Sequence, residues 1–245
     1  MRLLASLGHY IATSTDAGIQ LHQFVSGRLA ADLPAAGTLE LEMTTGYPYE
    51  GALALRVLTA PASDAELAVR VPTWAGSFAA TLNGRPASAE RGGDSYLRVR
   101  RSWSAGDELT VEFPLSVRII HPDPRIDAVR SCVAFERGPL VYCVEGVDAP
   151  GTAGLRDVWL PRGVRPSVLP GLDIAGQRVV ALSVPGQAVA VPPRGWPYSD
   201  GTLAGAADGP PAPRALTAIP YYARANRGAT EMRVWIPVGE DNMAP

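Results

Sequence analysis

The sequence contains no lysine, so all 22 of its basic residues are arginine. It therefore cannot form a lysine Schiff base, and it lacks the lysine of a phosphate-binding P-loop. Arginine gives the surface planar guanidinium groups that stay charged at every physiological pH. The net charge is only −2, which argues against nucleic acid as a partner.

Cysteine and histidine are also scarce. Cys132 and Cys143 are too few for a disulfide framework or a four-ligand zinc site. His9, His22 and His121 are scattered along the chain without metal-ligand spacing, and we expect each to be structural. The sequence therefore predicts no catalytic, cofactor-binding or metal-binding residues in this chain.

Long apolar runs are absent as well. No stretch reaches the roughly 18 apolar residues that a membrane-spanning helix needs, so we predict no membrane partner. The first ten residues carry one charge and a short apolar stretch, without the cleavage site of a signal peptide. The compartment stays open on these grounds, with the cytoplasm slightly favoured.

What the chain does have is apolar material and residues that break helices. Hydrophobic residues make up 47% and charged residues 19%, which excludes a disordered protein and favours a packed core. The 25 glycines and 23 prolines leave little room for long helices. Short strands joined by turns are the expected architecture.

Alternation of apolar and polar residues dominates the first half of the sequence. Leu39, Leu41 and Met43 alternate with glutamates, and later segments around residues 53–57, 67–71, 97–99 and 109–113 repeat the pattern. Asn83-Gly84 is the strongest short signal for a hairpin turn. About seven half-buried strands bounded by turns predict a β-sandwich.

The second half contains fewer clear strands. We predict strands at 131–136, 140–145, 179–184, 188–191, 216–222 and 232–237, and we interpret residues 117–124 as a bridge stiffened by two prolines. A segment of about 20 residues rich in Pro, Gly and Ala separates two of these strands, and a loop of that length is typically mobile or functional.

Helix is predicted only at the N-terminus, over residues 2–12. Leu3, Leu4, Leu7 and Ile11 follow the three- and four-residue spacing of one apolar stripe. A helix this short needs a larger surface to pack against. In this chain the stripe must find another surface, stay exposed or fray.

Two pairs of residues are candidates for chemistry. Cys132 and Cys143 lie in adjacent predicted strands, where two small buried hydrophobes are the favoured interpretation and a disulfide is the alternative. Glu136 and Glu145 could form the carboxylate pair of a glycosidase, but such a pair requires a cleft. We expect both glutamates on an outward strand face.

Aromatic residues in turns and at strand ends are candidates for carbohydrate contact, because aromatic rings stack on sugars as well as packing cores. The loop Trp196–Tyr198 is the foremost of these. The others stand at Tyr47, Tyr49, Trp74, Trp103, Tyr221, Tyr222 and Trp235.

One segment, Arg137–Glu145 (RGPLVYCVE), resembles a characteristic segment of the β-L-arabinofuranosidases of glycoside hydrolase family 127. Further stretches resemble the family in the same order; they are residues 45–51, 70–75, 82–84, 96–107, 219–223, 226–228 and 231–235. Arg224 departs from the pattern, since the family has Trp at that position. The resemblance covers nearly the whole chain.

The resemblance implies a larger enzyme. Members of the family carry an N-terminal (α/α)6 barrel whose zinc-bound Cys nucleophile lies in a Cys-Cys-Pro-Pro-Asn motif, just ahead of a helix similar to residues 2–8. No position here matches that motif, and neither Cys132 nor Cys143 corresponds to the nucleophile. The resemblance thus implies zinc and catalysis in the barrel and none in this chain.

These observations lead to one expectation of architecture and two of function. We expect an all-β chain: residues 1–26 as the remnant of the last barrel helix with a connecting strand, then β-sandwich-type domains at 27–118 and 119–245. The favoured function is a non-catalytic region that supports an upstream barrel, with carbohydrate as a further partner. The alternative is a free-standing carbohydrate-binding or scaffolding module.

Overall fold

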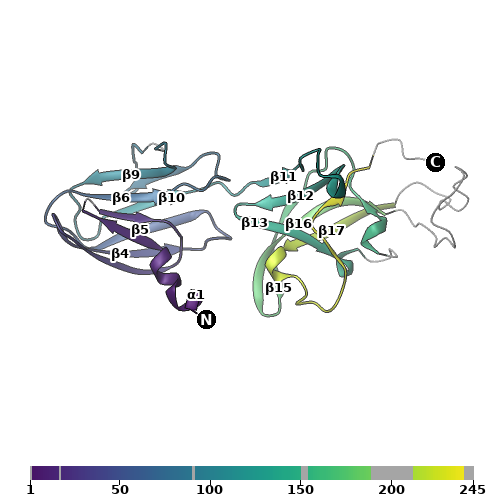
Figure 1. The fold of residues 1–245 in the computed structure, drawn as a ribbon, viewed down its shortest axis with the longest axis horizontal. Coiled ribbons are helices and arrows are strands. Elements are labelled where there is room, and N and C mark those ends of the chain that lie inside the picture. Colours follow the sequence, from purple (N-terminus) through teal and green to yellow (C-terminus); the bar gives the residue numbers. More distant parts are fainter. Residues whose placement is uncertain (1, 17, 90–91, 150–153, 189–211, 240–245) are drawn as a thin grey trace, which may run out of the picture. The chain divides into compact units, whose positions relative to one another are not determined.

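The computed structural model describes residues 2–16, 18–89, 92–149, 154–188 and 212–239. Within these ranges the chain is built of β-strands with one short α-helix, and it divides into unit 1 (Met1–Leu115) and unit 2 (Ser116–Pro245) (Figure 1). No helix in the described part is long and apolar enough to span a membrane. The predicted all-β class with two sandwich-type domains is confirmed.

Unit 1 contains two sheets. The four-stranded sheet has the order β1 (Ala12–Thr15), β2 (Gly18–Leu21), β6 (Ala65–Arg70), β9 (Tyr96–Arg101). The six-stranded sheet has the order β3 (Gly27–Leu33), β4 (Gly37–Thr45), β5 (Ala52–Thr59), β10 (Glu108–Glu112), β7 (Ala79–Leu82), β8 (Arg85–Pro86).

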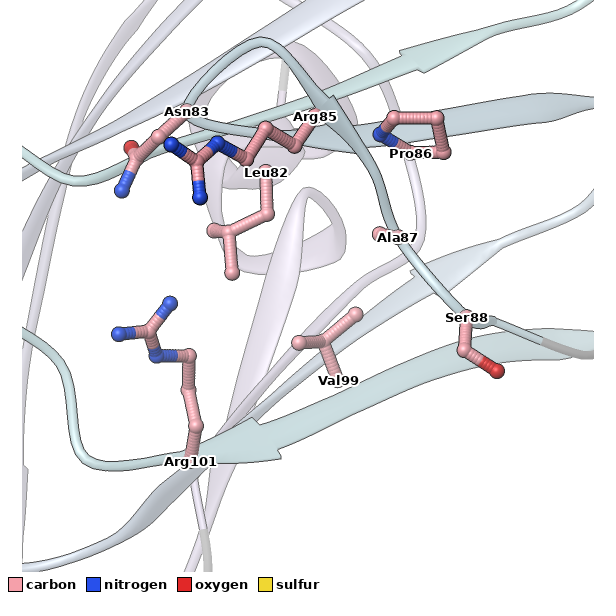
Figure 2. A pocket seen from close by; sticks show the side chains of 8 residues that line it. All are labelled: Leu82, Asn83, Arg85, Pro86, Ala87, Ser88, Val99 and Arg101. Carbon is pink, nitrogen blue, oxygen red and sulfur yellow. The ribbon is translucent and has the colours of Figure 1, made fainter.

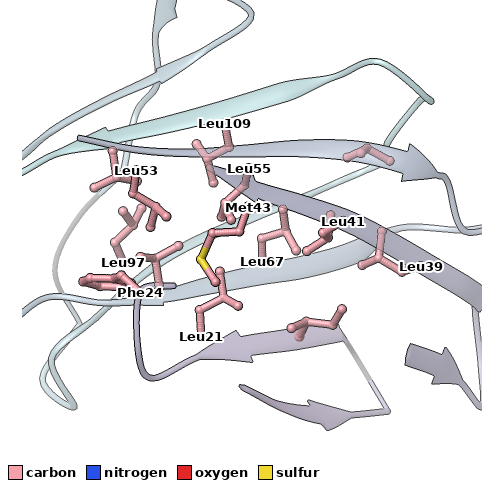
Figure 3. Packing of buried hydrophobic residues seen from close by; sticks show 14 of the residues in the cluster. Leu21, Phe24, Leu39, Leu41, Met43, Leu53, Leu55, Leu67, Leu97 and Leu109 are labelled. Carbon is pink, nitrogen blue, oxygen red and sulfur yellow. The ribbon is translucent and has the colours of Figure 1, made fainter. Parts of the chain in front are cut away.

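The inward-facing residues of both sheets form one apolar core, and Figure 3 shows its centre. Alternate residues of β4 point into it, as the period of two requires. Each fully buried leucine contributes about 1.5–3 kcal/mol relative to an exposed one. The labelled core residues are Leu21, Phe24, Leu39, Leu41, Met43, Leu53, Leu55, Leu67, Leu97 and Leu109.

Strand β2 belongs to unit 1, although the sequence grouped it with a barrel remnant ending at residue 26. It pairs in parallel with β6, from Gly18 opposite Glu66 to Leu21 opposite Val69. A Cβ atom on Gly18 would lie 1.9 Å from the Glu66 carbonyl oxygen, so only glycine fits this approach. Because the two strands lie more than 40 residues apart in the sequence, no local pattern predicts that they pair.

The N-terminal helix is shorter than predicted. Helix α1 (Arg2–Ser6) passes into the 3-10 helix η1 (Leu7–Tyr10), because Gly8 is a poor helix former and Ala12 already enters β1. The side chains of Leu3 and Leu4 are 65% and 70% exposed. Most of the predicted apolar stripe therefore stays exposed.

The turn predicted at Asn83-Gly84 is confirmed. It joins β7 to β8 with Leu82 opposite Arg85. Both turn residues have positive φ, 51° and 75°, as a two-residue hairpin turn of this hand requires.

Unit 2 is a branched sheet system. Its main path is β11 (Val117–Ile120), β12 (Cys132–Arg137), β13 (Leu140–Glu145), β17 (Ala212–Pro220), β16 (Gln177–Ala188), β14 (Val158–Trp159). Off this path, β15 (Ser167–Ile174) pairs with β16, β18 (Met232–Arg233) with β13, and β19 (Ile236–Pro237) with β12. Two separate apolar clusters fill it.

Two sequence predictions for this region were wrong. Residues 117–120 are not a bridge, because β11 pairs along its length with β12; the chain accordingly divides after Leu115 and not after residue 118. The strand predicted at 179–184 continues through Pro185-Gly186 to Ala188 as the single strand β16. Of the strand predicted at 188–191, residues 189–191 lie outside the described residues.

Candidate functional site

A hollow of about 730 Å³ lies in unit 1 between the β7–β8 hairpin and strand β9 (Figure 2). Both β8 and β9 are edge strands, each the last in its sheet. The hollow therefore occupies an open side of the sandwich. Its lining residues are Leu82, Asn83, Arg85, Pro86, Ala87, Ser88, Val99 and Arg101.

Aliphatic and cationic groups share this surface. Leu82 and Val99 are half-buried and form an aliphatic floor. The guanidinium groups of Arg85 and Arg101 approach the hollow from its two strands, from opposite sides of the gap in Figure 2. An anion with an apolar body is the kind of ligand that such a surface can accommodate.

Arg101 is held in position before any ligand arrives. Its Nε donates a hydrogen bond to the carbonyl oxygen of Ser102 at 2.9 Å, and its guanidinium carbon lies 5.5 Å from the centre of the Trp103 ring. Its Nη2 is 3.7 Å from a carboxylate oxygen of Asp107. By contrast, Arg85 is exposed and forms no ion pair with a described residue.

Asn83 and Asp107 brace the turn beside the hollow. Asn83 Nδ2 donates to Asp107 Oδ1 at 2.8 Å, and Asn83 Oδ1 accepts from the backbone N–H of Glu108 at 2.8 Å. The Asn83 hydrogen bond, followed by that from the Ser104 N–H, lowers the pKa of Asp107. Asp107 therefore stays ionised, and with Arg85 and Arg101 the group carries one net positive charge.

Unit 2 contains a buried ionic cluster that the sequence did not predict. Arg227 donates to Glu145 Oε2 at 2.6 and 2.9 Å and to both carboxylate oxygens of Asp148 at 2.7 Å. Glu145 is 1% exposed and Asp148 8%. The hydrogen bond to Asp148, and next the hydrogen bonds to Glu145, raise the pKa of Arg227.

Every carboxylate oxygen in this cluster has a donor. Glu145 Oε1 accepts from the N–H of Ala225 at 2.6 Å, and Asp148 Oδ2 accepts from the N–H of Glu145 at 3.0 Å. Both carboxylates are thus buried among donors that the protein itself supplies. We interpret the cluster as a structural clamp that fastens the 221–231 segment to β13.

The predicted outward orientation of Glu145 was therefore wrong. Its side chain points inward because it pairs with Arg227, which lies too far along the chain to affect a local sequence pattern. Glu136 instead forms an ion pair with Arg118 at 2.7 Å on a half-exposed surface. The two glutamates belong to separate ion pairs. They do not form the carboxylate pair of a glycosidase.

Both cysteines are free thiols. Cys143 is buried, and burial, with the nearby Glu145 and Asp148 charges, raises its pKa to about 11. Burial also raises the pKa of Cys132. The prediction of a small buried hydrophobe is confirmed for Cys143, whereas Cys132 is only half-buried, and the two form no disulfide. Protonated thiols are also poor nucleophiles.

The histidines do not converge. His22 Nδ1 lies 2.6 Å from the Tyr96 hydroxyl and its Nε2 lies 2.9 Å from Thr13 Oγ1, so both ring nitrogens have partners. His9 lies in η1, whereas His121 follows β11. Within the described ranges, no three His, Cys, Asp or Glu side chains form a group that could hold a metal ion. The described residues therefore do not fit zinc.

Three of the aromatic candidates, Tyr47, Trp74 and Trp103, pack in or against the core of unit 1, whereas Tyr49 and Trp235 are half-buried outside the core clusters. Phe24, Tyr47, Trp74 and Phe113 pack against one another with ring centres 5.2–6.4 Å apart. Trp103 is buried and donates to a backbone carbonyl. Tyr221 and Tyr222 are half exposed. The Trp196–Tyr198 loop lies outside the described residues.

Sequence reasoning also missed the hollow. A signal was available, because Leu97, Val99 and Arg101 alternate along β9 and therefore share a face. Arginine at an inward-facing position of a strand is unusual. The Asn83-Gly84 turn places Arg85 directly on the returning strand.

Comparison with family models gives two adjacent matches. Residues 18–115 match "Beta-L-arabinofuranosidase, GH127 middle domain". Residues 117–237 match "Glycoside hydrolase family 127 C-terminal domain". Together the two matches cover most of the chain.

Individual relatives are consistent with these matches. The chain is 34% identical to a non-reducing end β-L-arabinofuranosidase of Bifidobacterium longum subsp. longum, covering 96% of this chain and 35% of the relative. A solved glycoside hydrolase has a TM-score of 0.85 at 28% identity, with 98% of this chain and 39% of that chain covered. A GH127 β-L-arabinofuranosidase from Geobacillus stearothermophilus T6 has a TM-score of 0.79 at 31% identity, with 97% and 36% covered. The chain thus spans somewhat more than a third of the length of these relatives.

Proposed function

This chain belongs to glycoside hydrolase family 127, whose middle and C-terminal domains it comprises, and we propose on that premise that it is the non-catalytic β-sandwich part of a β-L-arabinofuranosidase-like enzyme. Its role is to support a catalytic domain. The observation that carries this proposal is the pair of adjacent domain matches, both within the part of the relatives that this chain spans.

The chemistry of the described residues supports a non-catalytic role. A retaining glycosidase needs a nucleophile and an acid a few ångströms apart, on either side of the sugar. The carboxylates of Glu145 and Asp148 are buried and accept hydrogen bonds from Arg227 and from backbone donors. The Cys143 thiol is protonated at neutral pH.

The N-terminal helix is evidence for packing against a catalytic domain. Leu3, Leu4, Leu7 and Tyr10 are all about half exposed or more. Apolar side chains gathered on one short helix are typical of a surface that packs against another domain. We therefore propose that this helix is where a catalytic domain meets the chain.

The test measures turnover and metal content of the purified chain together. We expect no hydrolysis of an aryl β-L-arabinofuranoside and no stoichiometric zinc, because the groups that both require do not converge here. Zinc near one equivalent that is lost in Cys143→Ser, accompanied by turnover, would overturn the proposal.

The DNA upstream of the Met1 codon separates this proposal from a free-standing carbohydrate-binding module. An in-frame run encoding Cys-Cys-Pro-Pro-Asn would support a catalytic domain in the same gene or a split enzyme. Its absence, together with carbohydrate binding by the isolated chain, would favour the free-standing module.

A further inference from the structure

The hollow beside β9 has features that are not needed by a region that only supports a catalytic domain. Two guanidinium groups face an aliphatic floor on the open side of a sandwich whose remaining interior is apolar. An arginine without a carboxylate partner keeps its N–H donors available for a ligand. Here Arg85 has no carboxylate partner among the described residues, and Arg101 shares Asp107 only at 3.7 Å.

We propose that this hollow is a binding site for a carboxylate-bearing sugar residue, a uronate, with Arg85 and Arg101 holding the carboxylate. Recognition of the anion rests on the geometry alone. The choice of a sugar over other carboxylates rests on the proposed function, since the chain belongs to a family of glycoside hydrolases.

The two arginines suit a carboxylate. A guanidinium presents a planar set of N–H donors that matches the two oxygens of a carboxylate. The contacts of Arg101 with Ser102 and Trp103 fix its orientation in advance, so that little side-chain entropy is lost on binding. Arg85, exposed on the opposite strand, can close on the same anion.

The floor offers aliphatic contacts to a saturated ring and, within the described ranges, no stacking partner to an aromatic one. Its apolar residues are Leu82, Pro86, Ala87 and Val99, and none of the described residues that line the hollow is aromatic. Nucleobases stack on aromatic side chains, whereas the C–H face of a pyranose can rest on aliphatic groups. The Ser88 hydroxyl and the remaining amide capacity of Asn83 supply partners for ring hydroxyls.

The volume is compatible with such a ligand. About 730 Å³ lies within the range of roughly 300–1,000 Å³ that small-molecule sites occupy. The net charge of +1 at the hollow, from Arg85 and Arg101 against Asp107, disfavours neutral and cationic ligands relative to an anion.

The experiment is isothermal titration of the full chain with methyl galactopyranosiduronate and with methyl galactopyranoside. These two glycosides differ at C6 only, where one has a carboxylate and the other a hydroxymethyl group. We expect the uronate to bind. The neutral sugar should bind at least about tenfold more weakly, because it lacks a charge-assisted hydrogen bond. Acetate and inorganic phosphate serve as anions without the ring.

Two variants locate the site. Arg85→Gln removes a charge from an exposed side chain and leaves the fold intact, and we expect it to weaken uronate binding about tenfold. Arg100→Gln is the matched control, because Arg100 lies next to Arg101 on β9 and is exposed on the opposite face of that strand. Its affinity for the uronate should equal that of the wild type.

Several results would overturn the proposal. They are equal affinity for the neutral glycoside, affinity for acetate or phosphate equal to that for the uronate, unchanged affinity in Arg85→Gln, or no binding of the uronate at all. Because the readout is binding by the isolated chain, the absence of arabinofuranosidase activity leaves this test unaffected.

Discussion

Units 1 and 2 are both all-β, but they bury different chemistry. The interior of unit 1 is a single apolar cluster that extends from Ile19 to Phe113. Unit 2 divides its apolar residues between two smaller clusters, and the buried acidic residues of the described chain, Glu145, Asp148 and Asp157, all lie there.

The difference follows from how each unit holds its loops. In unit 1, two facing sheets enclose the core and short turns complete it. In unit 2, the segment between β17 and β18 is fastened by polar contacts. Arg227 donates to Glu145 and Asp148, and the Leu155 N–H donates to Glu231 at 2.6 Å. Unit 2 therefore depends on buried polar contacts as well as apolar packing, whereas the buried core of unit 1 is apolar.

Arg227→Met gives the largest expected effect and tests this dependence. It leaves Glu145 and Asp148 buried without their cation, which costs about 3–5 kcal/mol. Hydrogen exchange read by mass spectrometry should show the loss in peptides of unit 2, with peptides of unit 1 unchanged.

Arg118→Met is the control for that variant. It removes the cation of the half-exposed ion pair with Glu136, and we expect it to cost less than about 1 kcal/mol. Equal effects of the two variants would contradict the clamp.

Leu55→Ala probes the apolar interior of unit 1 in the same way. Leu55 is fully buried at the centre of the cluster in Figure 3, and truncation should cost about 2–5 kcal/mol through lost burial and the cavity left behind. Val25→Ala, at a side chain that is 52% exposed, is the control. If Leu55→Ala lowered protection in unit 2 as much as in unit 1, the two interiors would not be independent.

Gly84→Val tests the turn that closes the hairpin next to the hollow. Gly84 has φ of 75°, where a β-branched residue is strained, and we expect a cost of about 1–2 kcal/mol. Gly27→Val, at the start of β3 where a Cβ meets nothing within 4 Å, should be close to neutral. An unchanged melting temperature in Gly84→Val would count against the turn.

The smallest effect concerns pH and is confined to unit 1. Because the pKa of Asp107 is lower in the folded chain, its contribution is complete above the unfolded pKa near 3.9 and is lost as pH falls through the folded value. The stability difference between wild type and Asp107→Asn should therefore be largest at pH 6–7 and shrink towards about pH 3. Melting curves over this range check it, and a constant difference would contradict the lowered pKa.

The sequence predicted the strands whose residues alternate between a buried and an exposed face. It missed strands without that regular alternation. Leu39, Leu41 and Met43 alternate with glutamates because one face of β4 is buried and the other is not. Strand β15 escaped because Pro170-Gly171 interrupts it at a bulge. Strand β16 tolerates Pro185 because β15 ends its pairing at Ser183 and leaves that side of the strand open.

The candidate sites were harder to predict because they depend on pairs distant in the chain. No residue near Glu145 in the sequence indicates that Arg227 pairs with it. The expectation that the charged side chain points outward was therefore wrong. The hollow needs Arg85 and Arg101 on strands of two different sheets. Periodicity specifies which face of a strand a residue occupies, but it does not specify which strands become neighbours.

The parallel pairing of β2 with β6 has a consequence for synthesis on the ribosome. Residues 18–21 are translated before the partner strand at 65–70, so the β1–β2 hairpin must wait for β6 while the intervening hairpins form. Until β2 docks, the outer edge of β6 is a free template that carries Leu67 and Val69. A chain shortened to begin after Leu21 would keep that edge open permanently, and such an edge promotes aggregation by strand addition between molecules. The glycine at position 18, which lets β2 approach Glu66, thus also protects the chain from self-association.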